Sequence, residues 1–297
     1  MAVFTGAGVA LVTPFAKDQS VDYEALEVML ERQIAGGTDA IIICGTTGEP
    51  ATMTAEEKLS CISFAVKTVA HRVPVIAGTG GNCTRDVITM SQKVQELGAD
   101  GLLVVTPFYN KATQQGLYEH YKAIGEAVKL PIIMYNVPSR TGLNILPETA
   151  VKIAREVEFV VGIKEASGDI SQIARLAALG KGCIDIYSGN DDQIIPILSM
   201  GGIGVISVLS NICPRETHDM VMEYLDGDRE HALALQLQYL KLVKALFWEV
   251  NPIPSKAALH HMGLCENVLR LPMTCMQQEK ERELVALLEE YGICPVL

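Results

Sequence analysis

Short runs of β-branched and other apolar residues recur along residues 8–208, and they constrain the fold more than any other feature of the sequence. Most of the intervals between these runs carry apolar residues with helical spacing. Such alternation is typical of βα units, in which parallel strands are joined through helices. The eight runs are Gly8–Val12, Ala40–Cys44, Val75–Gly78, Gly101–Val105, Ile132–Asn136, Val160–Lys164, Ile184–Ser188 and Gly204–Val208.

The number of units distinguishes between the two common parallel-sheet folds. Eight units within about 220 residues fit a closed (β/α)8 barrel, the TIM barrel, better than an open doubly wound sheet. After the eighth run the strand pattern stops, and residues 228–250, 254–263 and 276–291 show helical periodicity. We therefore expect an α/β fold with a barrel catalytic domain over residues 1–226 and a C-terminal helical region over residues 227–297.

The composition excludes several classes of protein. Of the 297 residues, 49% are hydrophobic and 20% are charged, which excludes an intrinsically disordered chain. The 24 Lys and Arg against 35 Asp and Glu give a net charge of −11 with no basic run, so we expect no nucleic-acid partner. No apolar run reaches the roughly 18 residues that a membrane span needs, so we also expect no membrane association.

The N-terminus and the cysteines predict a cytoplasmic protein. Residues 1–6 lack the basic and apolar segments of a secretory signal peptide. The eight cysteines include no Cys-x-x-Cys pair, and most are flanked by apolar residues. This pattern is typical of small buried thiols in a reducing compartment.

Lys164 is the most unusual residue at the carboxyl ends of the predicted strands, where a barrel of this type carries its active site. It follows the apolar run Val160–Ile163, and strand alternation places it on one face with Gly162, which leaves room for a long side chain. Burial lowers the pKa of a lysine and makes the neutral amine nucleophilic. The alternative interpretation is a lysine paired with Glu165 at the barrel rim.

Polar residues at neighbouring strand ends favour the reactive lysine. Tyr135 lies one strand earlier at a similar height and can transfer a proton through its phenol, and Tyr109 follows the fourth strand and could join it. Buried hydroxyls need partners, so this grouping has no obvious packing purpose. The loop at Thr46 and Thr47 offers hydroxyl and backbone N–H groups suited to a carboxylate, and Arg140 could hold a second carboxylate. Taken singly, the loop could be an ordinary polar turn and the arginine a surface residue.

Metal and nucleotide chemistry find little support. None of the six histidines lies at a predicted strand end, and His260 and His261 are adjacent on a helix, so they point about 100° apart and cannot chelate one ion. No glycine-rich phosphate-binding motif follows a strand. These observations leave amine chemistry, as in a Schiff-base lyase or aldolase, and we expect neither a cofactor nor a metal.

Three motifs then indicate a family. They are Gly45-Thr46-Thr47-Gly48-Glu49, Tyr135-Asn136-Val137-Pro138-Ser139-Arg140-Thr141-Gly142 and Gly162-Ile163-Lys164-Glu165-Ala166-Ser167-Gly168. In this order and at strand ends, the motifs resemble the dihydrodipicolinate synthase (4-hydroxy-tetrahydrodipicolinate synthase) family, within the N-acetylneuraminate lyase group. The resemblance covers nearly the whole chain, from Gly6 to Met273.

The resemblance implies a Schiff-base aldol condensation without a cofactor. Lys164 would form an imine with pyruvate, whose carboxylate the loop at Thr46 and Thr47 would hold. The enamine formed next would attack L-aspartate 4-semialdehyde, positioned by Arg140. The product would feed lysine and diaminopimelate synthesis. The family's other site residues correspond to a proton relay of Tyr135, Thr47 and Tyr109, with Tyr109 contributed across a dimer interface, and to Gly189 and Ile206 lining the pyruvate site.

Assembly and regulation are also implied by the resemblance. Members of the family are usually homotetramers, so we expect a dimer of dimers. Lysine-inhibited members carry small or polar residues where this sequence has Pro50, Ala55 and Lys58, although Asn82 and Asp86 remain as candidates for an effector site. Phe108 also replaces a common tyrosine of the family. We expect weak or absent inhibition by lysine, because the Lys58 ammonium would repel that of the effector.

Two alternatives remain open on the sequence. A related pyruvate aldolase, such as N-acetylneuraminate lyase or a 2-keto-3-deoxy sugar acid aldolase, would keep Lys164 and Tyr135 but would not explain Arg140 in its motif. A non-catalytic binding protein on the same barrel should have lost the lysine or the tyrosine, and both are present. A borohydride trap with pyruvate distinguishes a non-catalytic binding protein from an enzyme. Assays with L-aspartate 4-semialdehyde and with sugar acids then distinguish the synthase from a related aldolase.

Overall fold

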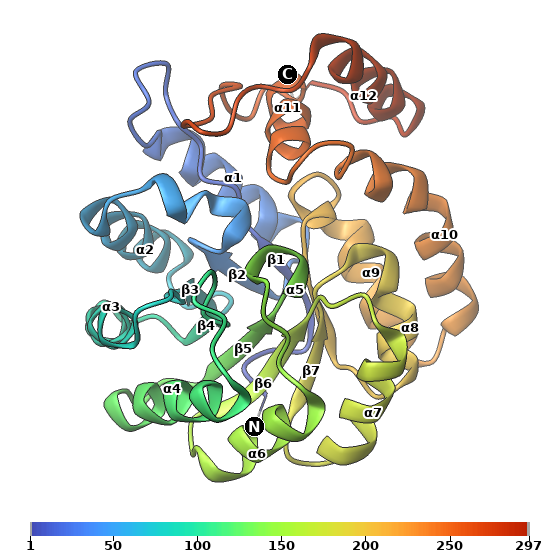
Figure 1. Ribbon diagram of the computed structural model, residues 1–297. Helices are drawn as coiled ribbons and strands as arrows, with labels where there is room; N and C mark the ends of the chain where they lie inside the picture. The colour runs from blue at the N-terminus through green and yellow to red at the C-terminus, as the bar shows by residue number, and fades with distance from the viewer. Residues whose placement is uncertain (1, 296–297) are drawn as a thin grey trace.

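Eight parallel strands close into a barrel in chain order in the computed structural model, which describes residues 2–295 (Figure 1). The barrel closes because β1 pairs with both β2 and β8. The predicted (β/α)8 fold is therefore confirmed. The strands are β1 (Gly6–Ala10), β2 (Ala40–Ile43), β3 (Val75–Gly78), β4 (Gly101–Val105), β5 (Ile132–Asn136), β6 (Val160–Glu165), β7 (Asp185–Ser188) and β8 (Gly204–Ser207).

Helices surround the barrel and continue into a C-terminal group beside it (Figure 1). The helices of the barrel are α1 (Tyr23–Ala35), α2 (Ala55–Val69), α3 (Thr84–Glu96), α4 (Gln114–Ala127), α5 (Pro138–Thr141), α6 (Pro147–Glu156), α7 (Ile170–Gly180), α8 (Ile194–Ser199) and α9 (Pro214–Asp226). Those of the C-terminal region are α10 (Arg229–Ala245), α11 (Ile253–His261) and α12 (Gln278–Glu290). Within residues 2–295, no helix is both long and apolar enough to cross a membrane.

The first strand differs most from its predicted range. It begins at Gly6 and ends at Ala10, whereas the apolar pattern predicts Gly8–Val12. The ladder starts early because Gly6 is in register with Gly204 of β8. It ends early because the N–H of Val12 donates to the side chain of Asn211 at 3.1 Å instead of to a neighbouring strand.

The amino end of the barrel is closed by aromatic packing. The Phe4 and Tyr187 rings stack with centroids 4.5 Å apart, and the Tyr187 hydroxyl donates to the Phe4 carbonyl at 2.7 Å. Above them, aliphatic side chains such as Ile42 and Ile133 fill the interior. A solvent-accessible site is therefore left at the carboxyl ends of the strands.

The C-terminal region is joined to the barrel by a buried ion pair. Lys256 Nζ of α11 lies 2.5 Å from Glu49 Oε1, and both side chains are fully buried. The same ammonium donates to the Val268 carbonyl at 2.6 Å and lies 4.0 Å above the centre of the Phe15 ring. Because Glu49 directly follows the turn Thr46–Gly48, this pair holds the C-terminal helices against one wall of the predicted site. Helices α9 and α10 lie on either side of the predicted boundary at residue 226, and the division into two domains stays a prediction.

Candidate active site

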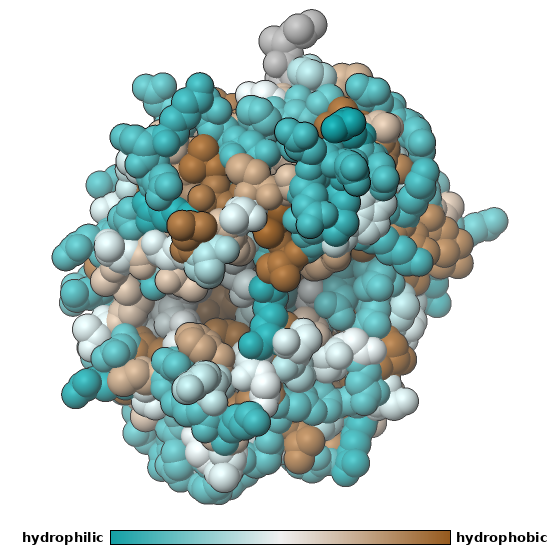
Figure 2. Space-filling view, turned by 45° about the horizontal axis from the view of Figure 1, so that its top comes forward, coloured by the Kyte–Doolittle hydropathy of each residue, from teal (hydrophilic) through white to brown (hydrophobic). Residues whose placement is uncertain are grey.

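A cavity of about 540 Å³ opens at the carboxyl ends of the strands, and we call it the barrel-mouth cavity. Figure 2 shows the surface hollowed on this side of the molecule. Loops after several strands line the cavity together with residues 247–251, which connect α10 to α11. The sequence-predicted residues that line it are Thr46, Thr47, Tyr135, Arg140, Lys164 and Gly189.

Lys164 is buried at the base of this cavity. It lies on β6 directly opposite Tyr135 of β5, as the strand pattern predicts, and only 5% of its surface is exposed. Its Nζ lies 4.5 Å from the centre of the Tyr135 ring. Burial lowers the pKa of the lysine to about 8, so far more of the nucleophilic neutral amine is present near neutral pH than in an exposed lysine.

A glycine provides the space for this lysine. A Cβ atom on Gly189 would lie 2.6 Å from the Cβ of Ala166 and 3.1 Å from the Cε of Lys164. The first of these distances is too short for real carbon atoms, so any larger residue would push the wall of the cavity apart. Gly189 thus lines the cavity with its backbone, as the resemblance implies.

Two charged groups act on Lys164 in opposite directions. The Asp191 carboxylate raises the pKa of the lysine, and the Arg140 guanidinium lowers it, and both effects are smaller than that of burial. Asp191 is itself buried, and its Oδ2 accepts from the backbone N–H groups of Val208 and Leu209 at 3.0 and 2.9 Å. Burial raises the pKa of this carboxyl above its usual value.

The Tyr135 phenol lies between the lysine and the Thr46 loop. Burial raises the pKa of the phenol, and the Arg140 charge and a hydrogen bond with the Thr46 side chain oppose that shift. The Thr46 side chain thus lies close to the Tyr135 phenol, and the role of Thr47 in a proton relay stays a prediction.

The threonine loop is a tight turn followed by a left-handed residue. Residues 46–48 form one turn of 3₁₀ helix, and Glu49 has φ of 54°. The Thr13 hydroxyl donates to the Gly48 carbonyl at 2.8 Å and so ties the turn to the segment that follows β1. Thr47 is 2% exposed, and its hydroxyl oxygen accepts from the Asn251 side-chain amide at 2.9 Å.

Asn251 also contacts the predicted carboxylate-binding arginine. The Arg140 Nη2 donates to the Asn251 main-chain carbonyl at 3.0 Å. Asn251 was not predicted as a site residue from the sequence, because it lies in the C-terminal region and far along the chain from every strand end. The only sequence signal was its position at the start of the Asn-Pro-Ile-Pro segment, residues 251–254.

Two predicted site residues do not line the barrel-mouth cavity within the described part of the chain. Tyr109 is 89% exposed with φ of 73°, and its backbone N–H donates to the Thr141 carbonyl at 3.3 Å. Ile206 is fully buried inside the barrel, in one apolar cluster with Tyr135 and Tyr187. A single chain thus places the Tyr109 phenol outside the group formed by Lys164 and Tyr135.

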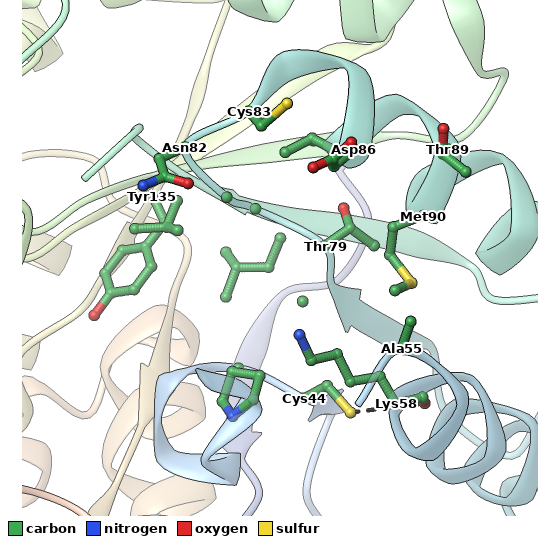
Figure 3. A pocket seen from close by; sticks show the side chains of 18 of the residues that line it. Cys44, Ala55, Lys58, Thr79, Asn82, Cys83, Asp86, Thr89, Met90 and Tyr135 are labelled. Carbon is green, nitrogen blue, oxygen red and sulfur yellow. Dashed lines mark hydrogen bonds between the residues drawn. The ribbon is translucent and has the colours of Figure 1, made fainter. Parts of the chain in front are cut away.

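A second cavity, of about 460 Å³, lies between α2 and α3 and borders Tyr135 from the other side (Figure 3). We call it the α2–α3 cavity. In Figure 3 the Lys58 side chain extends from α2 into it, with Asn82 and Asp86 across the space. Pro50 and Ala55 complete the same wall as Lys58. The residues predicted to determine the response to lysine are therefore brought together.

Comparison with known proteins places this barrel in a family. The model of the dihydrodipicolinate synthetase family matches residues 3–291. The chain belongs to that family. A relative from Lachnoclostridium phytofermentans named 4-hydroxy-tetrahydrodipicolinate synthase is 54% identical, covering 99% of this chain and 100% of the relative. One of the same name from Caldicellulosiruptor bescii is 56% identical, covering 99% of each chain.

A solved structure agrees with these relatives. The crystal structure of dihydrodipicolinate synthase from Aquifex aeolicus matches with a TM-score of 0.97 at 44% identity, covering 99% of this chain and 100% of that one. Together the matches confirm the predicted family, and with it the prediction of a 4-hydroxy-tetrahydrodipicolinate synthase, a lyase of the class I aldolase type.

Proposed function

We propose that this chain condenses pyruvate with L-aspartate 4-semialdehyde through a Schiff base on Lys164. The observation that carries the proposal is a buried lysine with a lowered pKa, placed beside a tyrosine at the mouth of a (β/α)8 barrel. Membership of the family supports the choice of substrates.

In the proposed reaction the neutral Lys164 amine attacks the ketone carbon of pyruvate, and loss of water gives an imine. Removal of a proton from the methyl carbon then gives an enamine. That carbon attacks the aldehyde carbon of the second substrate, and the aldehyde oxygen takes up a proton. The amino group of the second substrate then attacks the imine carbon, which breaks the bond to Lys164 and frees its amine. We assign the proton transfers to the Tyr135 phenol, because it lines the same cavity as Lys164 and its ring centre lies 4.5 Å from the lysine Nζ.

The binding roles that we propose follow from the negative charges of the two substrates. Both substrates are carboxylates, whereas the chain as a whole is acidic, so local cations and N–H groups must hold them. We assign the pyruvate carboxylate to the Thr46–Thr47 loop and the semialdehyde carboxylate to Arg140. Because the Thr46 side chain acts on the Tyr135 phenol, we assign the relay contact to Thr46 in place of Thr47 and keep Thr47 as a carboxylate ligand. Gly189 would shape the pyruvate side of the cavity, and Ile206 would support the site from within the barrel, in the apolar cluster that it shares with Tyr135.

We also propose that the enzyme acts as a homotetramer, a dimer of dimers, in the cytoplasm. Tyr109 is exposed on one chain, and Phe108 beside it is 41% exposed, which suits residues covered by a partner. A partner's phenol would complete the relay, so activity would depend on assembly. Sedimentation of the active enzyme tests this assignment, and a fully active monomer would contradict it.

The Schiff base can be tested by trapping. Incubation with pyruvate followed by sodium borohydride should add one reduced pyruvate to each chain, and peptide mapping should place it on Lys164. The initial trapping rate should rise about tenfold per pH unit below neutrality and level off above about pH 9, because the reactive species is the neutral amine of a group with a pKa of about 8. Absence of an adduct on folded protein would overturn the mechanism, and a rate still climbing beyond pH 10 would contradict the lowered pKa.

Inhibition by lysine should be weak or absent. The Lys58 ammonium occupies the wall of the α2–α3 cavity, where it would repel a lysine effector by up to roughly 1 kcal/mol. Steady-state assays with millimolar L-lysine should therefore show little change in rate. Lys58→Gln removes the repulsion and should increase the response. Sub-millimolar inhibition of the unmodified enzyme would show that the prediction is wrong.

A further inference from the structure

We propose that Asn251 is a positioning residue that orients the Thr47 hydroxyl so that it donates its proton to the carboxylate of pyruvate. The inference rests on the proposed function, because it takes that carboxylate to be bound at the Thr46–Thr47 loop. It assigns a role in the reaction to a residue of the C-terminal helical region.

The contact between the two side chains is buried and direct. Asn251 is 4% exposed, and its Nδ2 lies 2.9 Å from Thr47 Oγ1. Both residues line the barrel-mouth cavity together with Lys164. The two residues are 204 positions apart in the chain, so the contact exists only where the segment before α11 lies against the barrel mouth.

The orientation of the Asn251 amide is determined by a third residue. The Ser255 hydroxyl, which is fully buried, lies 3.3 Å from Asn251 Oδ1 and donates to it. The amide oxygen therefore faces α11, and the NH₂ group faces Thr47. An amide nitrogen can only donate, so Thr47 Oγ1 must be the acceptor in this contact.

This arrangement determines where the Thr47 proton can point. A threonine hydroxyl carries one O–H donor, and here one of its acceptor positions is filled by the amide. Within residues 2–295 the one hydrogen bond of the Thr47 hydroxyl is the one it accepts from Asn251, so we infer that its proton points into the cavity that Thr47 lines. A carboxylate there would receive a charge-assisted hydrogen bond, which is stronger than a bond between neutral groups.

The same residue holds the arginine by a different atom. Arg140 Nη2 donates to the main-chain carbonyl of Asn251, and this contact does not depend on the side chain at position 251. A substitution there should therefore alter the pyruvate carboxylate site and leave the contact to Arg140 in place. This separation is the basis of the test.

Asn251→Asp reverses the polarity of the contact with almost no change in shape. The carboxylate of the variant accepts the Thr47 proton and withdraws it from pyruvate. We expect the KM for pyruvate, and the pyruvate concentration that half-saturates borohydride trapping, to rise about 10- to 100-fold. The kcat and the KM for L-aspartate 4-semialdehyde should stay within about threefold, because the contact to Arg140 is kept. Asn251→Ala should give a smaller rise of the same kind.

The same substitution made in a Thr47→Val variant tests whether Asn251 acts through Thr47. In Thr47→Val the hydroxyl is absent, so adding Asn251→Asp should raise the KM for pyruvate far less than it does in the unmodified enzyme. Asn267→Ala, in the same C-terminal region but away from the cavity, is the control and should leave every constant unchanged. Thermal melting of each variant shows whether it is folded.

Four results would overturn the inference. An unchanged KM for pyruvate in Asn251→Asp removes the positioning role and leaves the Schiff-base proposal intact. Equal changes in both KM values and in kcat would indicate a merely structural role, as would full additivity with Thr47→Val. Failure of the unmodified enzyme to form any pyruvate adduct would overturn the proposed function and this inference with it.

Discussion

Replacing Lys164 with alanine is expected to abolish the pyruvate adduct and to lower kcat by at least about 10³-fold, because the variant has no amine with which to form the imine. The fold should remain, because the side chain lies at a cavity wall and the variant no longer has to bury an amino group, which is costly. The measurement is steady-state turnover together with intact mass after borohydride treatment.

Lys152 provides a matched control for that substitution. It is also a lysine above a tyrosine ring, with Nζ 4.0 Å from the centre of the Tyr118 ring, but it lies on α6 outside the barrel mouth. Lys152→Ala should therefore keep both the adduct and the turnover. If Lys164→Ala retained a pyruvate adduct, another amine would be the nucleophile and the proposed mechanism would be wrong.

Replacing Lys256 with methionine is expected to destabilise the protein by about 3–5 kcal/mol, because the Glu49 carboxylate would be left buried without its partner. For a chain of this size the melting temperature should fall by about 5–8 °C. Differential scanning calorimetry or a thermal melt followed by circular dichroism measures the shift.

Two further variants test whether the loss of stability comes from the burial of the unpaired charge or only from the loss of an ion pair. The Lys241–Glu290 pair has a similar distance, 2.8 Å, but its side chains are 64% and 61% exposed, so Lys241→Met should cost at most about 1 kcal/mol. The double variant Glu49→Leu, Lys256→Met removes both buried charges and should recover much of the lost stability. Equal melting temperatures for Lys256→Met and Lys241→Met would contradict this account.

The barrel and the position of the lysine could be predicted because both are periodic properties of the chain. Eight apolar runs separated by helical stretches leave few arrangements other than a closed parallel barrel. Three of the strands, β3, β4 and β5, have the predicted ends. Alternation along β5 and β6 then places Tyr135 and Lys164 side by side, and the structure has them in register.

The response to lysine and the place of Tyr109 could not be predicted from the periodicity of the sequence. The sequence indicates a response to lysine only through the resemblance, and the α2–α3 cavity shows in addition that Lys58 and Asp86 border one space. Tyr109 lies outside the barrel-mouth cavity of its own chain, a property of the left-handed turn after β4 that no periodicity predicts.

The sequence by itself therefore determined the fold, the end of the barrel that carries the candidate site, and the lysine that we propose as nucleophile, because each depends on spacing along a strand or between successive units. Only the tertiary structure decided which groups tune and orient these residues. The lowered pKa of Lys164 requires burial from all sides, and the contacts of Asn251 with Thr47 and of Lys256 with Glu49 each join segments about 200 residues apart. Such contacts depend on how the C-terminal helices dock on the finished barrel, and no local run of residues encodes that docking.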